Sequence, residues 1–321
     1  MSDCLSSLPP GMTVLERGWL SANNIVFAAL PGDRDSDGEG AAVVDTGYVA
    51  HAPQTLALVE AALQGAPLAR ILNTHLHSDH CGGNAALQAA YPQVQTWIAP
   101  GQADQVRAWD EAALSYRATG QECPRFAVTG VLQPGGTVRL SGRDWQVHAA
   151  PGHDPHSIIL FEPASRTLIS ADALWENGFG VVFPEIEGLA AFDEVAATLD
   201  VIERLQPLAV VPGHGSVFAD AGPALATARR RLDGFVRSPE RHAGYAAKVL
   251  LKYKLLEWQR IALPALQDWV QRTPYFGLLH RRYFADQGLH QWLDGLIDGL
   301  VASGAALRQP VPGNPDMLLN L

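Results

Sequence analysis

The 321-residue sequence is poor in cysteine and contains no long apolar run. Its three cysteines, Cys4, Cys81 and Cys123, are odd in number and lack the spacing of thiolate metal sites. They therefore predict neither a disulfide framework nor a zinc site built from cysteine. No stretch of about 18 apolar residues could span a bilayer, and residues 1–20 lack the basic start and apolar core of a secretory signal. We expect a cytoplasmic protein with no membrane partner.

Lysine is missing from residues 1–228, which carry 10 arginines against 25 Asp and Glu side chains, a balance of −15. Residues 229–321 carry 13 Lys and Arg against 8 Asp and Glu, a balance of +5. A charge shift of this kind between two parts of a chain indicates two modules. Ser238-Pro239 marks the predicted boundary, which gives domains of residues 1–238 and 239–321.

Three histidines and an aspartate crowd together at His75, His77, Asp79 and His80. Such groups repel or desolvate one another unless a cation binds their lone pairs, and this ligand set suits Zn, Fe or Mn. The apolar run 68–72 before them predicts a strand. Because side chains alternate along a strand, we expect His75 and His77 on one face, with Asp79 and His80 brought to the same space by the turn that follows.

This run resembles the His-x-His-x-Asp-His signature of the metallo-β-lactamase superfamily. Four further motifs stand in that family's order along the chain, and they are centred on Asp45, His153, Asp172 and His214. Five matching motifs in order make a chance similarity, or a set of merely packed histidines, a poor explanation. The resemblance implies an α/β fold, the αββα metallo-β-lactamase sandwich.

Residues 239–321 show a different pattern, with helical periodicity over residues 243–258, 263–270 and 290–302. This layout resembles the winged-helix tail of some superfamily members, including lactamase-β-like endoribonucleases. We therefore expect a small, mainly helical, winged-helix-like C-terminal domain after the catalytic domain.

The resemblance also implies a ligand set for two divalent metal ions, which we expect to be Zn, with Fe or Mn as alternatives. It assigns the first ion to His75, His77 and His153, the second to Asp79, His80 and His214, and a bridging position to Asp172. A hydroxide held between the ions would be the nucleophile.

Catalytic roles beyond metal binding fall on three residues. Asp79 takes part as a ligand, and Asp45 is expected to orient the ligands without binding metal itself. His156 lies three positions after His153 and is a candidate proton donor to the leaving group; the alternative is a supporting or packed histidine.

Two segments are candidate walls of the substrate pocket. Residues 111–136 lack a clear period and predict a long loop over the site, and long loops in compact domains are more often functional than idle. Tyr116, Arg117, Arg125 and Phe126 on this loop either contact substrate or are simply solvated. The apolar segment 175–183 either lines the pocket or packs beneath a loop.

Three functions remain open. The first is a metal-dependent hydrolase resembling glyoxalase II, which cleaves a small thioester or ester, including an anionic one. The second is a phosphodiesterase or single-strand endoribonuclease, favoured by the basic tail but opposed by the −15 balance of the catalytic part, because nucleic-acid binding depends on phosphate neutralisation. The third is a non-catalytic metal-bound sensor. A homodimer is also left open. Candidate contacts to an anionic substrate are Arg229, Arg230, Arg231, Lys248, Lys252 and Lys254.

Overall fold

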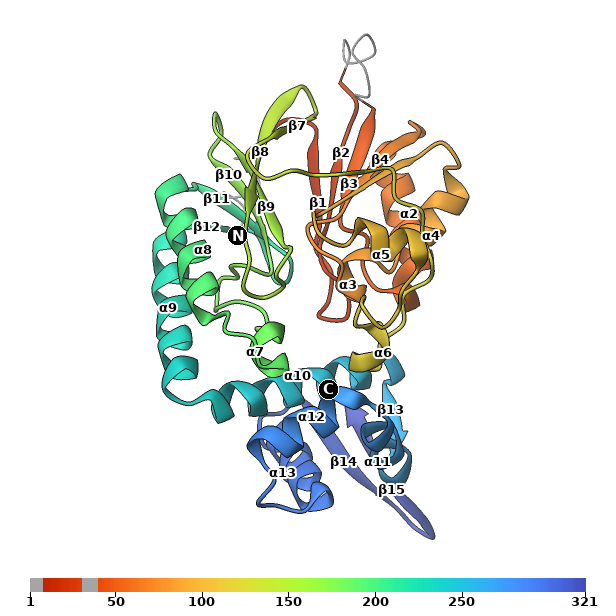
Figure 1. The fold of residues 1–321 in the computed structure, drawn as a ribbon. Coiled ribbons are helices and arrows are strands. Elements are labelled where there is room, and N and C mark those ends of the chain that lie inside the picture. Colours follow the sequence, from red (N-terminus) through yellow and green to blue (C-terminus); the bar gives the residue numbers. More distant parts are fainter. Residues whose placement is uncertain (1–7, 31–39) are drawn as a thin grey trace.

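The computed structural model describes residues 8–30 and 40–321 (Figure 1). Cys4 lies outside the described residues. Within the described part, the chain forms two facing sheets with helices on their outer sides, and a C-terminal region beneath them.

The first sheet contains six strands and carries helices on its outer face. β1 to β3 pair antiparallel and β3 to β6 pair parallel, so the parallel connections contain helices. Val26 and Val43 face outward to the helices, whereas Phe27 and Val44 face inward, as the period of two in a strand requires. The elements are β1 (Met12–Leu15), β2 (Asn24–Phe27), β3 (Ala41–Val44), β4 (Leu68–Leu72), β5 (Gln95–Ile98) and β6 (Gly130–Val131), with helices η2 (Val49–His51), α2 (Ala52–Leu63), α3 (Ser78–Cys81), α4 (Asn84–Ala90), α5 (Ala103–Ala108) and α6 (Tyr116–Thr119).

The second sheet also has six strands and is covered by two long helices. Leu199 and Ile202 of one helix and Leu225 and Phe235 of the other pack on its outer face. In spatial order its strands are β12 (Phe218–Ala219), β11 (Ala209–Pro212), β10 (Thr167–Ala171), β9 (Ile158–Glu162), β8 (Arg143–Ala149) and β7 (Thr137–Leu140), and the helices are α7 (Phe183–Glu187), α8 (Phe192–Leu205) and α9 (Ala221–Arg237).

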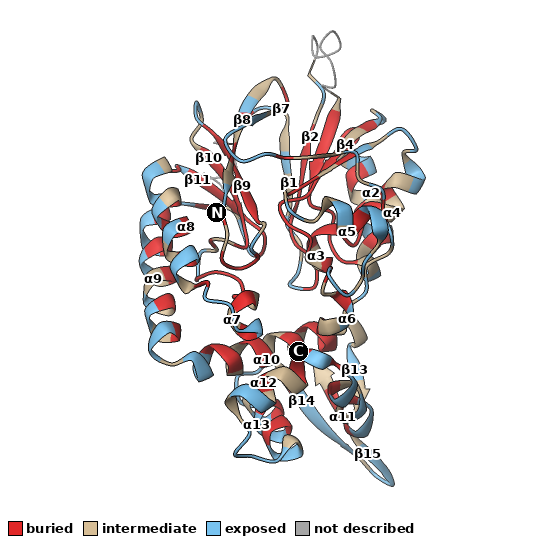
Figure 2. Cartoon of the chain, in the orientation of Figure 1, coloured by how far each residue is buried: buried red, intermediate tan, exposed pale blue. Residues whose placement is uncertain are grey.

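The inner faces of the two sheets form the central core. Phe27 of the first sheet meets Trp145 of the second edge to face, with ring centroids 5.2 Å apart, and Leu160 and Val211 belong to the same cluster. Figure 2 shows β2, β3, β9 and β10 buried and the outer sides of α8 and α9 exposed. This helix, sheet, sheet, helix layering confirms the predicted αββα sandwich.

The C-terminal region is mainly helical, but it also holds a three-stranded sheet and a helix, α12, that the sequence did not predict. The strands carry Pro310 and Pro315 and are largely exposed, so they lack the apolar alternation by which a strand is recognised. The winged-helix-like description stays a prediction. The elements are α10 (Pro239–Trp258), β13 (Arg260–Ala262), α11 (Leu263–Arg272), α12 (Pro274–Tyr283), α13 (Leu289–Ala302), β14 (Ala306–Val311) and β15 (Asn314–Asn320), with sheet order β13-β15-β14.

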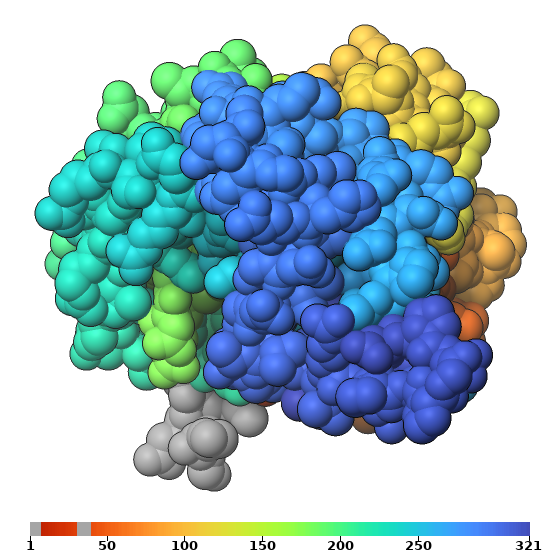
Figure 3. All heavy atoms as spheres, turned by 90° about the horizontal axis from the view of Figure 1, so that it is seen from below, coloured from red at the N-terminus to blue at the C-terminus, as the bar shows by residue number. Residues whose placement is uncertain are grey.

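Helix α10 crosses beneath both sheets, and seen from below the C-terminal region covers much of that face (Figures 1 and 3). Its core takes in Val181 and Ile186 from the preceding region, and Tyr253 packs with Leu20 and Tyr48 of the first sheet's side. The C-terminal region is therefore packed against the sandwich through two apolar clusters. Among the described residues, no helix combines the length and apolarity needed to cross a bilayer.

Candidate metal centre

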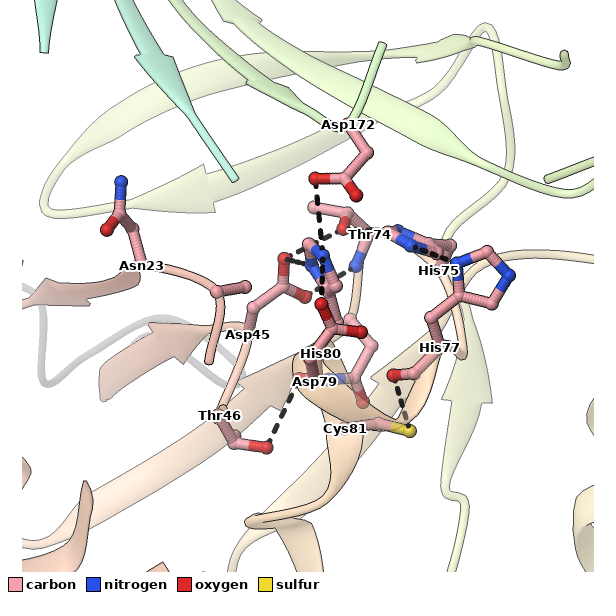
Figure 4. A network of polar contacts seen from close by, with 12 residues as sticks. Asn23, Asp45, Thr46, Thr74, His75, His77, Asp79, His80, Cys81 and Asp172 are labelled. Carbon is pink, nitrogen blue, oxygen red and sulfur yellow. Dashed lines mark hydrogen bonds and ion pairs between the residues drawn. The ribbon is translucent and has the colours of Figure 1, made fainter. Parts of the chain in front are cut away.

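The two histidines of the His-x-His pair lie on a loop, so the prediction that they alternate along a strand is wrong. β4 ends at Leu72, and residues 73–77 form an irregular segment before α3. The backbone leaves the sheet because the amide of Thr74 donates to Asp45 Oδ1 at 2.9 Å. This turn points both histidines into one space, as Figure 4 shows.

A first group of three nitrogens converges from two distant loops. His77 Nδ1 lies 3.1 Å from His75 Nε2 and 2.8 Å from His153 Nε2. His153 comes from the loop after β8, on the other sheet. These are the three residues predicted for the first metal ion, and their ligand atoms lie within 4.8 Å of one another.

A second group forms beside the first. His214 Nε2, from the loop after β11, lies 3.1 Å from Asp79 Oδ2, and His80 Nε2 lies 4.0 Å from the same oxygen. Asp172, at the end of β10, stands between the groups: its Oδ1 is 3.3 Å from His80 Nε2 and its Oδ2 is 3.4 Å from His153 Nε2. One carboxylate thus presents an oxygen to each group, as a bridging ligand would.

Hydrogen bonds to the outer ring nitrogens turn the inner nitrogens toward the centre. His80 Nδ1 lies 2.7 Å from Asp45 Oδ2, and His153 Nδ1 lies 2.6 Å from the carbonyl of Val181. With the proton on Nδ1, the lone pair of Nε2 faces inward. His80 Nε2 is buried and makes no hydrogen bond to the described residues. A buried polar atom left in this way calls for another partner, and a metal ion fits it.

Burial and neighbouring charges set the protonation of these rings. Burial, followed by the adjacent rings, lowers the pKa of His75, and it lowers the pKa of His153 to about 4. Burial also opposes charge on His80, but the carboxylates of Asp172 and Asp45 outweigh it and hold the pKa of His80 well above its usual value. These carboxylates favour a positive charge at His80, and a metal ion bound at Nε2 would supply that charge in place of the proton. His75 and His153 are therefore neutral near pH 7, the state in which imidazole binds a metal.

Residues 21–214 match the family model described as the metallo-beta-lactamase superfamily. The chain belongs to this superfamily. Its signature residues are the ones that the geometry brings together.

Several curated relatives of the chain carry the name hydroxyacylglutathione hydrolase. The protein of Synechococcus sp. strain JA-3-3Ab is 34% identical over 141 residues, which are 44% of this chain and 46% of the relative. That of Nostoc sp. strain PCC 7120 is 31% identical over 212 residues, 64% of this chain and 67% of the relative. That of Stenotrophomonas maltophilia is 36% identical over 162 residues, half of each protein. The chain thus spans about half to two thirds of the length of these relatives.

Solved structures agree on the fold. A beta-lactamase domain protein from Burkholderia ambifaria has a TM-score of 0.61 at 20% identity, over 98% of this chain and 93% of that one. TTHA1623, in a di-iron-bound form, has a TM-score of 0.50 at 27% identity, over 67% of this chain and 96% of that one.

Asp45 of the superfamily motif lies behind the ligands. Its Oδ2 approaches His80 Nδ1 and also accepts from the hydroxyl of Thr74 at 2.8 Å, while its Oδ1 accepts from the Thr74 amide. Figure 4 shows His80 between Asp45 and Asp172. The position agrees with an orienting role, which stays a prediction.

His156 is a predicted site residue whose contacts in the described part of the chain involve no metal ligand. A Cβ on Gly101 would come within 2.3 Å of His156 Nδ1, and the His156 amide donates to Asp154 Oδ1 at 2.8 Å. Among the described residues that line the cavity over the metal centre, His156 does not occur. Its proton-donor role therefore gains no support from its position. Asp154 lies closer to the ligands, with Oδ2 3.9 Å from His77 Nε2.

Two glycines permit the close approach of the superfamily ligands. A Cβ on Gly213 would stand 2.2 Å from Asp172 Oδ1, and one on Gly180 would stand 2.3 Å from His153 Nδ1. Side chains at either position would displace a ligand. Gly213 adjoins His214 in its motif, but no sequence signal pointed to Gly180.

The cavity over the centre has a volume of about 80 Å³ and is walled mainly by aromatic and apolar side chains. Tyr116 of the 111–136 segment and Trp175, Val181 and Phe183 of the 175–183 segment line it, so both segments reach the pocket. Arg117 and Arg125 do not line it; they contact Glu111 and the carbonyl of Arg107, and Phe126 is buried elsewhere. Helix α10 supplies a wall that the sequence did not predict, through Tyr245, Val249, Leu250 and Tyr253.

Proposed function

We propose that this chain is a metal-dependent hydrolase that cleaves a thioester or ester. The proposal depends above all on one observation: two groups of ligand atoms, each suited to a metal ion, flank the two oxygens of Asp172. Two divalent ions are the proposed cofactors, and Zn, Fe and Mn all accept these ligands. The di-iron form of TTHA1623 supports a site for two ions.

The thioester is the preferred substrate class for two reasons. Relatives of the chain are named hydroxyacylglutathione hydrolase, and hydroxyacylglutathione is a thioester. The cavity walls are mainly apolar, and its small volume suits an acyl group of a few carbons.

When bound, two such ions lower the pKa of a bound water to about 7 and polarise the substrate's carbonyl oxygen. The residues of the chain hold the geometry in which that chemistry takes place. Asp45 fixes the ring of His80, and the indole Nε1 of Trp175 donates to Asp172 Oδ1 at 3.2 Å, which holds that carboxylate between the two ligand groups. Tyr253 and Phe183 limit access of bulk water.

Residues 1–238 and 239–321 are proposed as two domains that act as one unit, because α10 of the second lines the pocket of the first. The nucleic-acid alternative finds less support, since several basic residues of the segment 229–321 have partners of their own. Arg229 pairs with Asp200 and Glu203, and Lys254 pairs with Glu257. Lys252 Nζ donates to the carbonyls of residues 305 and 321 and to Asn320.

Metal analysis coupled to a substrate panel tests the proposal. Protein purified without chelator should contain close to two transition-metal ions per chain, and it should hydrolyse thioesters or esters faster than lactones or phosphodiesters. Absence of a transition metal would overturn the mechanism. A fully loaded protein that cleaves none of the four substrate types would instead support the metal-bound sensor.

A further inference from the structure

A second cavity adjoins the one over the metal centre and shares four of its lining residues, Trp19, Trp175, His214 and Tyr245. It has a volume of about 180 Å³, and Asn177, Ser216 and Arg231 complete much of its wall. We call it the outer cavity. A molecule that reacts at the metal centre can therefore extend into a neighbouring space with a cationic residue in its wall.

Arg231 is held in place on the side of this cavity. Its guanidinium lies 4.6 Å from the ring centroid of Tyr245 and 5.9 Å from that of Phe235, within cation–π range. Nη1 approaches the carbonyl oxygens of Asn177 and Phe179 at 3.4 Å each. A Cβ on Gly178 would stand 2.3 Å from Nη1, so this glycine lets the turn pass close to the guanidinium.

The charge of Arg231 has no carboxylate partner within ion-pair distance in residues 8–30 and 40–321, although Glu176 lines the same cavity. Its two neighbours on α9 differ: Arg229 pairs with Asp200 and Glu203, and Arg230 donates to Thr227 on the exposed face. A guanidinium has five N–H donors. The two carbonyls approach Nη1, and the side chain of Tyr245 is a third polar neighbour. Donors therefore remain from which an anion in the outer cavity can accept.

We propose that Arg231 binds a carboxylate at the non-reacting end of the substrate, and so makes the enzyme selective for acidic thioesters or esters. This inference rests on the proposed hydrolase function and adds the chemistry by which that site would choose its substrate. A guanidinium edge matches the two oxygens of a carboxylate, which it can bind through two parallel hydrogen bonds. The outer cavity lies below the roughly 300–1,000 Å³ of sites that enclose drug-sized ligands, so its size suits a terminal group of the substrate.

The turn beside Arg231 sets the position of the carboxylate relative to the reacting centre. Trp175 and Gly178 pair across this turn, with the Trp175 amide donating to the Gly178 carbonyl at 2.7 Å. At one end the turn contacts Arg231, and at the other Trp175 Nε1 donates to Asp172 Oδ1. Trp19 stacks on His214 and meets Trp175 edge to face, which gives the passage between the two cavities an aromatic wall.

Kinetics of Arg231→Gln test the inference on a hydroxyacyl thioester of glutathione and on its dialkyl ester, in which both carboxylates are masked. We expect the KM for the acid to rise about tenfold or more with kcat changed less than twofold, because a charge-assisted hydrogen bond made to the bound substrate is lost. The KM for the dialkyl ester should not rise. Arg230→Gln, one residue away on the same helix, is the matched control and should leave the KM for both substrates unchanged.

A second variant has the opposite expected sign. Glu176→Gln removes a negative charge from the same cavity, so the KM for the acid should fall about twofold while that for the ester stays constant. If Arg231→Gln impairs both substrates equally, the residue only supports the turn, and the inference is wrong. It is also wrong if neither substrate responds.

Binding measured without turnover separates this inference from the proposed function. S-hexylglutathione, a thioether that cannot be hydrolysed, should quench the fluorescence of Trp19 and Trp175 and bind wild type about tenfold more tightly than Arg231→Gln. Its diester should bind both proteins alike. If wild type hydrolyses neither thioester, the hydrolase proposal fails, and this titration still decides whether Arg231 binds a carboxylate. Equal binding of S-hexylglutathione to both proteins would overturn the inference.

Discussion

The ligand loops and helix α10 meet at the same cavity but are built in different ways. The loops hold charged and polar groups. Their ligands are fixed by hydrogen bonds to other polar groups, such as that of His80 to Asp45 at 2.7 Å. Helix α10 contributes apolar and aromatic side chains, including Val249 and Leu250, fixed by packing in the C-terminal core. The loops therefore determine which chemistry is possible, whereas α10 limits which molecules reach the metal centre.

Asp172→Ala should produce the largest effect, because it removes the carboxylate that faces both ligand groups. We expect hydrolysis to fall by at least about 10³-fold and bound metal to decrease to one ion or fewer. Elemental analysis and kcat/KM on the preferred thioester measure the two effects. Full activity in this variant would show that the loops do not determine the chemistry.

The matched control for Asp172 lies in the neighbouring turn. Trp175→Phe keeps an aromatic ring but loses the Nε1 hydrogen bond to Asp172. It should retain both metal ions and lose far less activity than Asp172→Ala. Equal losses in the two variants would mean that the carboxylate matters for packing and not for metal binding.

Asp45→Asn should have the next largest effect. The amide oxygen can still accept from the Thr74 amide, but the NH2 group that replaces Oδ2 cannot accept from the Thr74 hydroxyl or from His80 Nδ1. The charge that favours a proton on His80 Nδ1 is also lost. Loss of such a supporting contact usually costs about 10–100-fold in metal affinity or activity. A competition titration with a chelator measures the affinity. If affinity is unchanged, Asp45 only ties the loop to β4.

His242→Gln tests the link between α10 and the ligand loops. His242 Nε2 accepts from the amide of Val182 at 3.1 Å, and the preceding carbonyl, of Val181, accepts from His153 Nδ1. Burial, and then the charge of Arg231, lowers the pKa of His242 to about 4. In the unfolded chain the pKa of His242 is near 6.5, so between pH 4 and 6.5 the unfolded state binds more protons at this residue than the folded state does. The contribution of His242 to stability is therefore complete above pH 6.5 and declines as the pH falls.

Chemical denaturation between pH 4 and 7.5 measures that decline. The difference in unfolding free energy between wild type and His242→Gln should shrink by up to about 3 kcal/mol as pH falls from 6.5 to 4. His290→Gln, at an exposed position in the same region, is the control, and its unfolding free energy should change with pH as that of wild type does. A constant difference across this range would show that α10 does not contact the loops through a neutral histidine.

The sequence predicted the ligand loops better than it predicted α10 for a physical reason. Four candidate ligands stand within residues 75–80, and the others adjoin strand ends that a sandwich brings to one edge, so local spacing carries the information. The strand assignment of His75 failed because the bond between Thr74 and Asp45 spans 29 residues and has no local signature.

Helix α10 shows the opposite case. Its periodicity predicted a buried face, but nothing in that pattern states what the face covers, and Tyr245 and Tyr253 line a cavity built by residues far away in the chain. The three consecutive arginines of α9 make the same point. Consecutive residues on a helix point about 100° apart, so Arg229 and Arg230 meet acidic partners or solvent while Arg231 reaches the outer cavity.

Cys81→Ser should have the smallest effect, although Cys81 directly follows a ligand. Its thiol is buried against the carbonyls of Leu76 and His77, at 3.5 and 3.3 Å, and lies 3.3 Å from the Tyr116 hydroxyl. Burial raises the pKa of this thiol, so it stays protonated and unreactive near pH 7.

A serine hydroxyl at position 81 can donate to the same carbonyls, and we therefore expect kcat/KM within about twofold of wild type and unchanged metal content. Cys123→Ser, which alters the sulfur 3.7 Å away, is the control. A tenfold loss in Cys81→Ser alone would place a thiol among the groups that determine the chemistry, and would end the division between polar ligand loops and an apolar helix.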